Sequence, residues 1–245
     1  MSNHLMSNSV MSPNMPKTIL LTGASRGIGR ATAELLASQG HRLALVARDS
    51  PDLHEVAAAT SSLALPADIS LESNATRAVQ EAIHHFGHLD ALICNAGVGS
   101  FTELEHFSPD EFDRIFATNV RGTFLLCRAA IPHFKERRQG HVIGITSDVA
   151  RRTFPHGTAY GASKYAQDAL LGSLRKEVRP HNIKVSIIYP GLVDTSFNNE
   201  TPNDPAKAAT HLRPHDIAQA IAYVLHQPPG VVVDELTIHP LSQEW

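Results

Sequence analysis

The chain has 245 residues, 42% of them hydrophobic and 18% charged, with a formal net charge of −3 at pH 7. This composition favours one globular domain, because α/β folds often run to about 250 residues as a single unit. Near-neutral charge with scattered Lys and Arg argues against nucleic acid or a membrane surface as the main partner, so we expect a small-molecule partner.

The N-terminus is polar, and all four methionines fall within residues 1–15. We predict that residues 1–16 form a disordered leader and that residues 17–245 form one catalytic domain. No apolar run approaches the roughly 18 residues that cross a bilayer, and no secretory signal pattern is present, so a cytoplasmic protein is expected.

Cysteine and histidine usage argues against disulfides and metal centres. The two cysteines, Cys94 and Cys127, lie in apolar segments, which predicts neither a disulfide framework nor a structural zinc site. The fifteen histidines are spread along the chain, and their tightest group, residues 84–88, is typical of an exposed helix end. We therefore expect no metal ion.

Short apolar runs alternate with longer segments of helical spacing, beginning near Lys17 and a first run that stops at Gly23. Continuous apolar strands between helices indicate an α/β fold with a doubly wound parallel sheet of about seven strands, covered on both faces. Residues 192–213 break this rhythm and are predicted to form a substrate lid. The predicted strands are residues 18–22, 42–47, 62–65, 89–94, 141–146, 184–189 and 231–238; the predicted helices are residues 27–39, 72–86, 108–134, 158–179 and 214–226.

A glycine-rich turn, Thr-Gly-Ala-Ser-Arg-Gly-Ile-Gly at residues 22–29, joins the first strand to the first helix. At this place a Rossmann-type fold presents backbone N–H groups to the pyrophosphate of a dinucleotide. Gly23 would permit the tight turn, Gly27 the approach of a phosphate, and Gly29 the close packing of the helix. The spacing differs from the usual six-residue fingerprint.

The same turn also fits Gly-x-Ser-x-Gly, the nucleophile elbow of α/β-hydrolases, with Ser25 as the nucleophile. An elbow on the first strand, with no His-Gly-Gly-Gly motif upstream, would be atypical. A serine hydrolase is therefore the less favoured alternative.

The end of the second strand bears on the choice of cofactor. An NAD site usually places a carboxylate on the ribose 2′-hydroxyl about 20 residues beyond the glycine turn, and Ala47 stands there instead. Arg48, with Arg26 in the turn, would offer cationic donors to a 2′-phosphate, which favours NADP(H). Asp49 keeps NAD(H) open, and two solvated surface arginines are the alternative.

Tyr160 and Lys164 lie four residues apart in a predicted helix, so both side chains project from one face. A free tyrosine has a pKa of about 10, and each unit of depression requires about 1.4 kcal/mol. An adjacent ammonium and a nicotinamide cation would supply several such units, giving a phenol that exchanges a proton near neutral pH.

Two further polar residues belong to this hypothesis. Ser147 follows the strand at residues 141–146, at the carboxyl edge where its hydroxyl would meet a substrate carbonyl. Asn119 lies at helical spacing among apolar neighbours, so its amide is expected to be buried and hydrogen-bonded. Asn119 either makes a structural hydrogen bond or holds a water that passes protons to Lys164.

Together these residues resemble the short-chain dehydrogenase/reductase family from about Lys17 to the C-terminus. The motifs that carry the resemblance also include Asp68-Ile69, Asn95-Ala96-Gly97 and the run Pro-Gly-Leu-Val-Asp-Thr at residues 190–195. The resemblance implies that Tyr160 is the acid/base, that Lys164 binds the ribose and lowers the tyrosine pKa, that Ser147 orients the carbonyl, and that Asn119 completes the proton relay.

The resemblance also implies a cofactor site. Asp68 and Ile69 would meet the adenine, the Asn95 turn would support the sheet edge, and Val193 and Thr195 would hold the carboxamide. The predicted cofactor-binding residues are Gly23, Ser25, Arg26, Gly27, Ile28, Gly29, Arg48, Asp68, Ile69, Asn95, Ala96, Gly97, Tyr160, Lys164, Pro190, Gly191, Val193 and Thr195.

The predicted function is hydride transfer between NADP(H) and a carbonyl or alcohol substrate, as in a carbonyl reductase or alcohol dehydrogenase. A non-catalytic NADP(H)-binding sensor on the same fold is a second alternative. Pairing through the helices at residues 108–134 and 158–179, as in many relatives, implies a homodimer or homotetramer.

Two features depart from the family pattern. Asp148 follows the serine where relatives often carry a small or apolar residue, and Arg151-Arg152 lie close behind it. Either feature would shape the choice of substrate. Arg151, Arg152 and His156 would suit a polar or anionic substrate group, although a solvated surface is the favoured interpretation.

Overall fold

Parallel strands form the centre of the computed structural model, which describes residues 15–197, 200–202 and 204–244. Within these residues the sheet has seven strands in the order β3-β2-β1-β4-β5-β6-β7, and all neighbouring strands run parallel. The strands are β1 (Thr18–Thr22), β2 (Arg42–Ala47), β3 (Leu63–Pro66), β4 (Ala91–Cys94), β5 (Gly140–Ile145), β6 (Ile183–Pro190) and β7 (Glu235–Ile238). The predicted leader lies outside the described residues, except for Met15 and Pro16.

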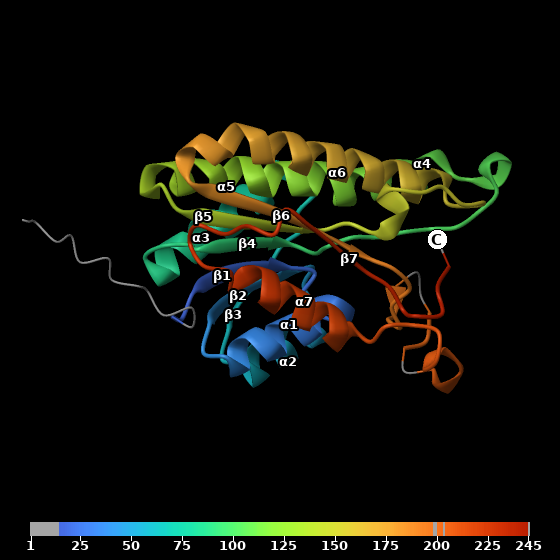
Figure 1. Cartoon of the computed structure of the whole chain (residues 1–245), viewed down its shortest axis with the longest axis horizontal. Helices are drawn as coiled ribbons and strands as arrows, with labels where there is room; N and C mark the ends of the chain where they lie inside the picture. Colours follow the sequence, from blue (N-terminus) through green and yellow to red (C-terminus); the bar gives the residue numbers. More distant parts are fainter. Residues whose placement is uncertain (1–14, 198–199, 203, 245) are drawn as a thin grey trace, which may run out of the picture.

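Helices cover both faces of this sheet, as Figure 1 shows. The helices α3, α5 and α6 contribute buried side chains to one face, and α1, α2 and α7 to the other. The helices are α1 (Gly27–Ser38), α2 (Pro51–Ala59), α3 (Glu72–Phe86), α4 (Pro109–Phe116), α5 (Thr123–Arg137), α6 (Thr158–Val178) and α7 (Pro214–Leu225). The predicted fold class, a doubly wound Rossmann-type α/β sheet, is confirmed.

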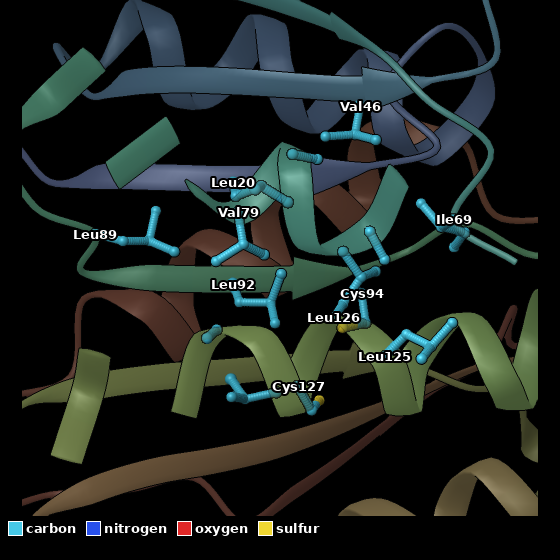
Figure 2. Packing of buried hydrophobic residues seen from close by; sticks show 14 of the residues in the cluster. Leu20, Val46, Ile69, Val79, Leu89, Leu92, Cys94, Leu125, Leu126 and Cys127 are labelled. Atoms are coloured by element: carbon cyan, nitrogen blue, oxygen red, sulfur yellow. The ribbon is translucent and has the colours of Figure 1, made fainter. Parts of the chain in front are cut away.

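The strand β1 is buried along its whole length because its side chains pack on both faces of the sheet. Side chains alternate across a strand, so Leu20 packs in one hydrophobic cluster while Ile19 and Leu21 pack in the other. Figure 2 shows the first cluster, in which Leu20 and Leu92 of the sheet lie close to Val79 of α3. The cysteines Cys94 and Cys127 are buried in this cluster as free thiols.

The structure differs from the predicted elements in three places. The helix α2 was not predicted, although Ser50 accepts a hydrogen bond from the Leu53 N–H and a proline follows at the first turn, which is an N-cap pattern. The predicted helix at residues 108–134 is divided into α4, a π-helical segment η2 (Ala117–Gly122), and α5. The predicted last strand starts only at Glu235.

Strand order makes the site. Because β1 leads outward to β2 on one side and its other neighbour is β4, the loops after β1 and β4 diverge and leave a crevice at the carboxyl edge. The segment predicted as a lid, residues 192–213, is tied at its ends, where the Leu212 N–H donates to the Leu192 carbonyl at 2.9 Å. Its role as a lid stays a prediction.

Among helices in the described part of the chain, none combines the length and apolarity needed to cross a bilayer.

Candidate active site

A cavity of about 800 Å³ opens at the carboxyl edge of the sheet. Its lining includes every predicted cofactor-binding residue except Gly29, together with Ser147. The lining therefore gathers residues from the loops after β1 through β6 and from α6, which are far apart in the sequence. Asn119 and Gly29 lie behind this lining rather than in it.

The glycine turn has the backbone conformation that its sequence predicts. Gly23 and Gly27 have φ values of +66° and +55°, a region that favours glycine. A Cβ at Gly29 would lie 2.0 Å from the Gly23 carbonyl oxygen, so a side chain there would disrupt the turn.

The first turn of α1 suits an anion. Arg26 at the N-cap supplies no side-chain hydrogen bond to the helix, and the first turn contains no acidic residue. Among the described residues, no side chain accepts from the first N–H groups of α1, and the turn that carries these groups lines the cavity. This donor set fits the phosphates of a dinucleotide.

The turn after β4 is locked to the glycine turn. Thr22 Oγ1 accepts from the N–H groups of Asn95 and Ala96, both at 3.1 Å, and the Asn95 amide donates to the Thr22 carbonyl at 2.9 Å. These bonds join the two loops on either side of the crevice.

Two cationic residues at the cavity edge, Arg26 and Arg48, differ from Arg114, which lines the cavity but pairs with Glu111 at 2.6 Å. Arg26 and Arg48 are exposed and line the cavity, and no ion pair engages either side chain within residues 15–197, 200–202 and 204–244. Asp49 instead pairs with His54, with 2.8 Å between Oδ1 and Nε2. The two guanidinium groups are therefore available to an anion.

Tyr160 and Lys164 face the cavity from α6, and both are buried. Lys164 Nζ lies 5.8 Å from the centre of the Tyr160 ring. The ammonium donates to the Ile145 carbonyl at 3.2 Å and to Gln167 Oε1 at 2.9 Å, which places it between α6 and the end of β5.

Burial controls the protonation of this pair. Burial raises the pKa of Tyr160 well above its usual range, and the nearby Ser147 hydroxyl opposes this only in part. Burial lowers the pKa of Lys164 to about 7. In the chain alone Tyr160 thus keeps its proton, because loss of solvent dominates both groups. The predicted depression of its pKa includes the nicotinamide cation and stays a prediction.

Ser147 follows β5 as predicted and lines the cavity. Its hydroxyl donates to Asp148 Oδ1 at 3.1 Å and accepts from the Val149 N–H at 3.3 Å. The serine is therefore held by its own loop.

Asn119 makes structural hydrogen bonds, the first of its two predicted alternatives. Its amide donates to the Val98 carbonyl at 2.9 Å and to Ser163 Oγ at 3.0 Å, and its oxygen accepts from the Val98 N–H at 2.8 Å. A Cβ at Gly97 would lie 3.4 Å from Asn119 Oδ1 and 3.5 Å from Lys164 Nζ. Asn119 and Lys164 thus approach one point, and the water relay stays a prediction.

The two arginines behind the serine are engaged by carboxylates of the chain. Arg151 pairs with Glu235 at 2.7 Å, and Arg152 with Asp148 at 2.7 Å. Since both charges are neutralised locally, neither residue favours an anionic substrate. His156 is exposed.

Two phenylalanines pack on the Tyr160 ring, and a third packs on one of them. Ring centres lie 5.5 Å apart for Phe101 and Tyr160, 5.4 Å for Tyr160 and Phe197, and 5.7 Å for Phe101 and Phe154. Phe101 and Phe154 were missed by sequence reasoning. Their signal is that each follows a strand, β4 or β5, whose carboxyl end meets the crevice.

Comparisons with known proteins agree with this geometry. The family model of the short chain dehydrogenase matches residues 17–206. An uncharacterized oxidoreductase of Staphylococcus epidermidis is 34% identical over 227 residues, which cover 92% of this chain and 97% of that protein.

Two solved structures are similar over nearly their whole length. One is an alcohol dehydrogenase from the archaeon Thermococcus sibiricus complexed with 5-hydroxy-NADP, with a TM-score of 0.86, 32% identity, and coverage of 94% of this chain and 99% of that one. The other is a 3-ketoacyl-(acyl-carrier-protein) reductase from Brucella melitensis complexed with NADH, with a TM-score of 0.85, 32% identity, and coverage of 92% and 97%.

Proposed function

The chain belongs to the short-chain dehydrogenase/reductase family, and on that premise we propose that it is an NADP(H)-dependent oxidoreductase that interconverts a carbonyl compound and its alcohol. The observation that carries the proposal is the meeting of Ser147, Tyr160 and Lys164 in one cavity with an anion-binding turn. These are the groups that proton transfer to a substrate oxygen requires.

The cofactor would lie along the crevice. The glycine turn and the N-terminus of α1 would hold the phosphates, and Arg26 and Arg48 the 2′-phosphate that distinguishes NADP(H) from NAD(H). Asp68 and Ile69 would meet the adenine, while Val193 and Thr195 would hold the carboxamide. When bound, the nicotinamide supplies or accepts the hydride.

The protein's part is the handling of charge on the substrate oxygen. The hydroxyls of Ser147 and Tyr160 would both donate to the carbonyl, so negative charge develops against donors already in place. During reduction the oxygen takes the Tyr160 proton, which is present because burial raises the pKa of this tyrosine. The ammonium of Lys164 stabilises the phenolate left behind.

The substrate oxygen must compete for the Ser147 proton. In the structure that proton is donated to Asp148 Oδ1. On substrate binding the hydroxyl would turn from the carboxylate to the carbonyl, so the other donors on Asp148 influence how readily the serine is released.

The surroundings of Tyr160 favour an apolar substituent on the substrate. Phe101 is 37% exposed and lies edge-on to the Tyr160 ring, and Phe197 lines the cavity itself. Aromatic side chains contribute through large buried apolar area. We therefore expect aryl and alkyl carbonyl compounds to be preferred over anionic ones.

We also propose that the enzyme is a homodimer or homotetramer that pairs through α5 and α6. Phe124 of α5 and Tyr165 of α6 are large apolar side chains with exposures of 48% and 41%. Contact between copies would cover them.

A matched substrate panel tests the function. Benzaldehyde and 4-carboxybenzaldehyde, which differ by one carboxylate, are incubated with NADPH, and the loss of nicotinamide absorbance is followed. We expect faster reduction of benzaldehyde; no reduction of either aldehyde would contradict the proposal.

Neither alternative oxidises NADPH in this experiment, and two further measurements separate them. A serine hydrolase would cleave esters without nicotinamide and lose activity in Ser25→Ala, but no histidine lines the cavity among the described residues. A sensor would bind NADPH and reduce nothing. The presence of Ser147, Tyr160 and Lys164 together favours the enzyme over the sensor.

A further inference from the structure

The chain after β7 returns to the active-site edge of the sheet. It turns where the Gln243 N–H donates to the Pro240 carbonyl at 2.9 Å, and the Gln243 side chain contacts the segment that follows β6. Figure 1 shows this last segment in red next to the orange residues after β6. Although Gln243 is 95 residues from Asp148 in the sequence, the fold brings the two side chains together.

The side-chain amide of Gln243 bridges two loops of the site. Its Oε1 accepts from the Leu192 N–H at 2.9 Å, and its Nε2 donates to Asp148 Oδ2 at 2.5 Å. Leu192 lies between Gly191 and Val193 in the loop proposed to hold the nicotinamide. A Cβ at Gly191 would lie 2.3 Å from Gln243 Oε1, so the amide approaches this closely only because residue 191 is glycine.

At its other end the bridge reaches the carboxylate behind Ser147. Asp148 is 2% exposed, and its Oδ1 accepts the Ser147 hydroxyl. Its Oδ2 takes the Gln243 amide and two donors of Arg152, at 2.7 and 3.1 Å, with His239 Nε2 at 3.7 Å. A buried carboxylate needs such partners. Each donor on Oδ2 draws negative charge away from Oδ1 and so makes Asp148 a weaker acceptor for the Ser147 hydroxyl.

A primary amide satisfies both ends of this bridge without binding or losing a proton. The Leu192 N–H requires an acceptor, while Asp148 requires a donor, and an amide carries both in one planar group. Glutamate at position 243 would still accept from Leu192, but it would set a second carboxylate against Asp148. The position therefore distinguishes glutamine from its isostere.

We propose that Gln243, acting through Asp148, is a positioning residue of the active site. It fixes the spacing between the Ser147 loop and the Leu192 loop, and it weakens the hold of Asp148 on the Ser147 proton so that the substrate carbonyl can take it. The inference rests on the proposed function, because it requires a substrate carbonyl to which the Ser147 hydroxyl donates when it leaves Asp148.

The test is the variant Gln243→Glu, with Gln219→Glu on the exposed face of α7 as the matched charge control. We expect Gln243→Glu to lower kcat about tenfold or more, since small misplacements of reacting groups cost that much. The deuterium isotope effect on kcat with NADPH deuterated at C4 should rise, because hydride transfer becomes the slow step. The fluorescence of bound NADPH, which reports on the ring, should also change, while the control variant behaves as wild type.

The double variant Asp148→Asn, Gln243→Glu provides the rescue. It exchanges donor and acceptor across the bridge but replaces the oxygen that accepts from Arg152 by an N–H₂ group, so kcat and NADPH fluorescence should recover in part relative to Gln243→Glu. Gln243→Met, which removes both hydrogen bonds without adding charge, gives a second measurement should Gln243→Glu fail to fold.

Two results would overturn the inference. One is a folded Gln243→Glu enzyme with the wild-type isotope effect and NADPH fluorescence; the other is a double variant no better than the single one. A fall in Tm alone, with kinetics unchanged, would show a structural role only and would also overturn it. If the wild type reduces no carbonyl compound, the proposed function fails. The comparison of NADPH fluorescence between wild type and Gln243→Glu still tests whether Gln243 positions the Leu192 loop.

Discussion

Replacement of Lys164 by methionine should stabilise the chain near neutral pH while abolishing turnover. Lys164 is 3% exposed, and its pKa is lowered from 10.5 to about 7 by burial. A lysine with a depressed folded pKa destabilises the protein most at low pH, and this cost disappears as the pH rises from the folded to the unfolded pKa. Stability of the wild type should therefore rise between pH 7 and pH 10.5, since the unfolded chain binds the extra proton there.

The expected gain follows from the pKa difference. A pKa lowered from 10.5 to about 7 means that the buried lysine reduces the free energy of unfolding by about 4 kcal/mol at pH 7 and by about 2 kcal/mol at pH 9. Methionine leaves the Ile145 carbonyl and Gln167 Oε1 without their donor, which costs about 2 kcal/mol in total. The net prediction is a gain of about 2 kcal/mol at pH 7 and about zero at pH 9.

Urea unfolding at both pH values, without cofactor, measures this difference. The same substitution at Lys176, exposed on α6, is the control and should show no pH-dependent gain. A Lys164→Met chain less stable than wild type at pH 7, or a gain that does not shrink at pH 9, would refute the reasoning. A substitution that stabilises the fold but removes activity is expected where a functional group that prefers water is buried.

Three other expectations test separate parts of the structure. Burial lowers the pKa of His141 to about 3, so the free energy of unfolding is highest above about pH 6.5 and falls as the pH falls. Urea unfolding should show a loss of about 2 kcal/mol by pH 5 in the wild type and no such loss in His141→Val. A pH dependence that persists in His141→Val would contradict the assignment. Arg48→Ala should weaken NADPH binding about tenfold relative to NADH by fluorescence titration, because one charge-assisted contact to the 2′-phosphate is lost; an unchanged ratio would reject the 2′-phosphate argument. Phe124→Asp should shift the sedimentation of the protein to that of a monomer, and an unchanged oligomer would exclude this face as the interface.

The parts of the fold that sequence alone predicts are those set by local patterns. Leu20 and its neighbours alternate between two cores, and the apolar run around them is readable as a buried strand. The glycine turn and the four-residue spacing of Tyr160 and Lys164 are also local, so their common cavity follows once the helix and the strands are assigned.

What sequence reasoning missed depends on contacts between distant segments. Phe101 and Phe197 pack on the Tyr160 ring and Phe154 packs on Phe101, and the three come from different loops. Their positions after strands place them near the crevice but do not show that the rings meet. Gln243 lies in a short C-terminal segment with no motif. The burial that raises the Tyr160 pKa in the chain alone was also missed, because helical spacing gives the neighbouring charge but not the burial of both groups.

The most direct test of the central claim is the comparison of wild type with Tyr160→Phe in NADPH oxidation by an aryl aldehyde, with NADPH affinity measured on the same samples. The substitution removes only the hydroxyl that gives its proton to the substrate oxygen. The proposed mechanism predicts unchanged NADPH binding and turnover reduced at least about a hundredfold. Turnover equal to wild type with NADPH bound would contradict it.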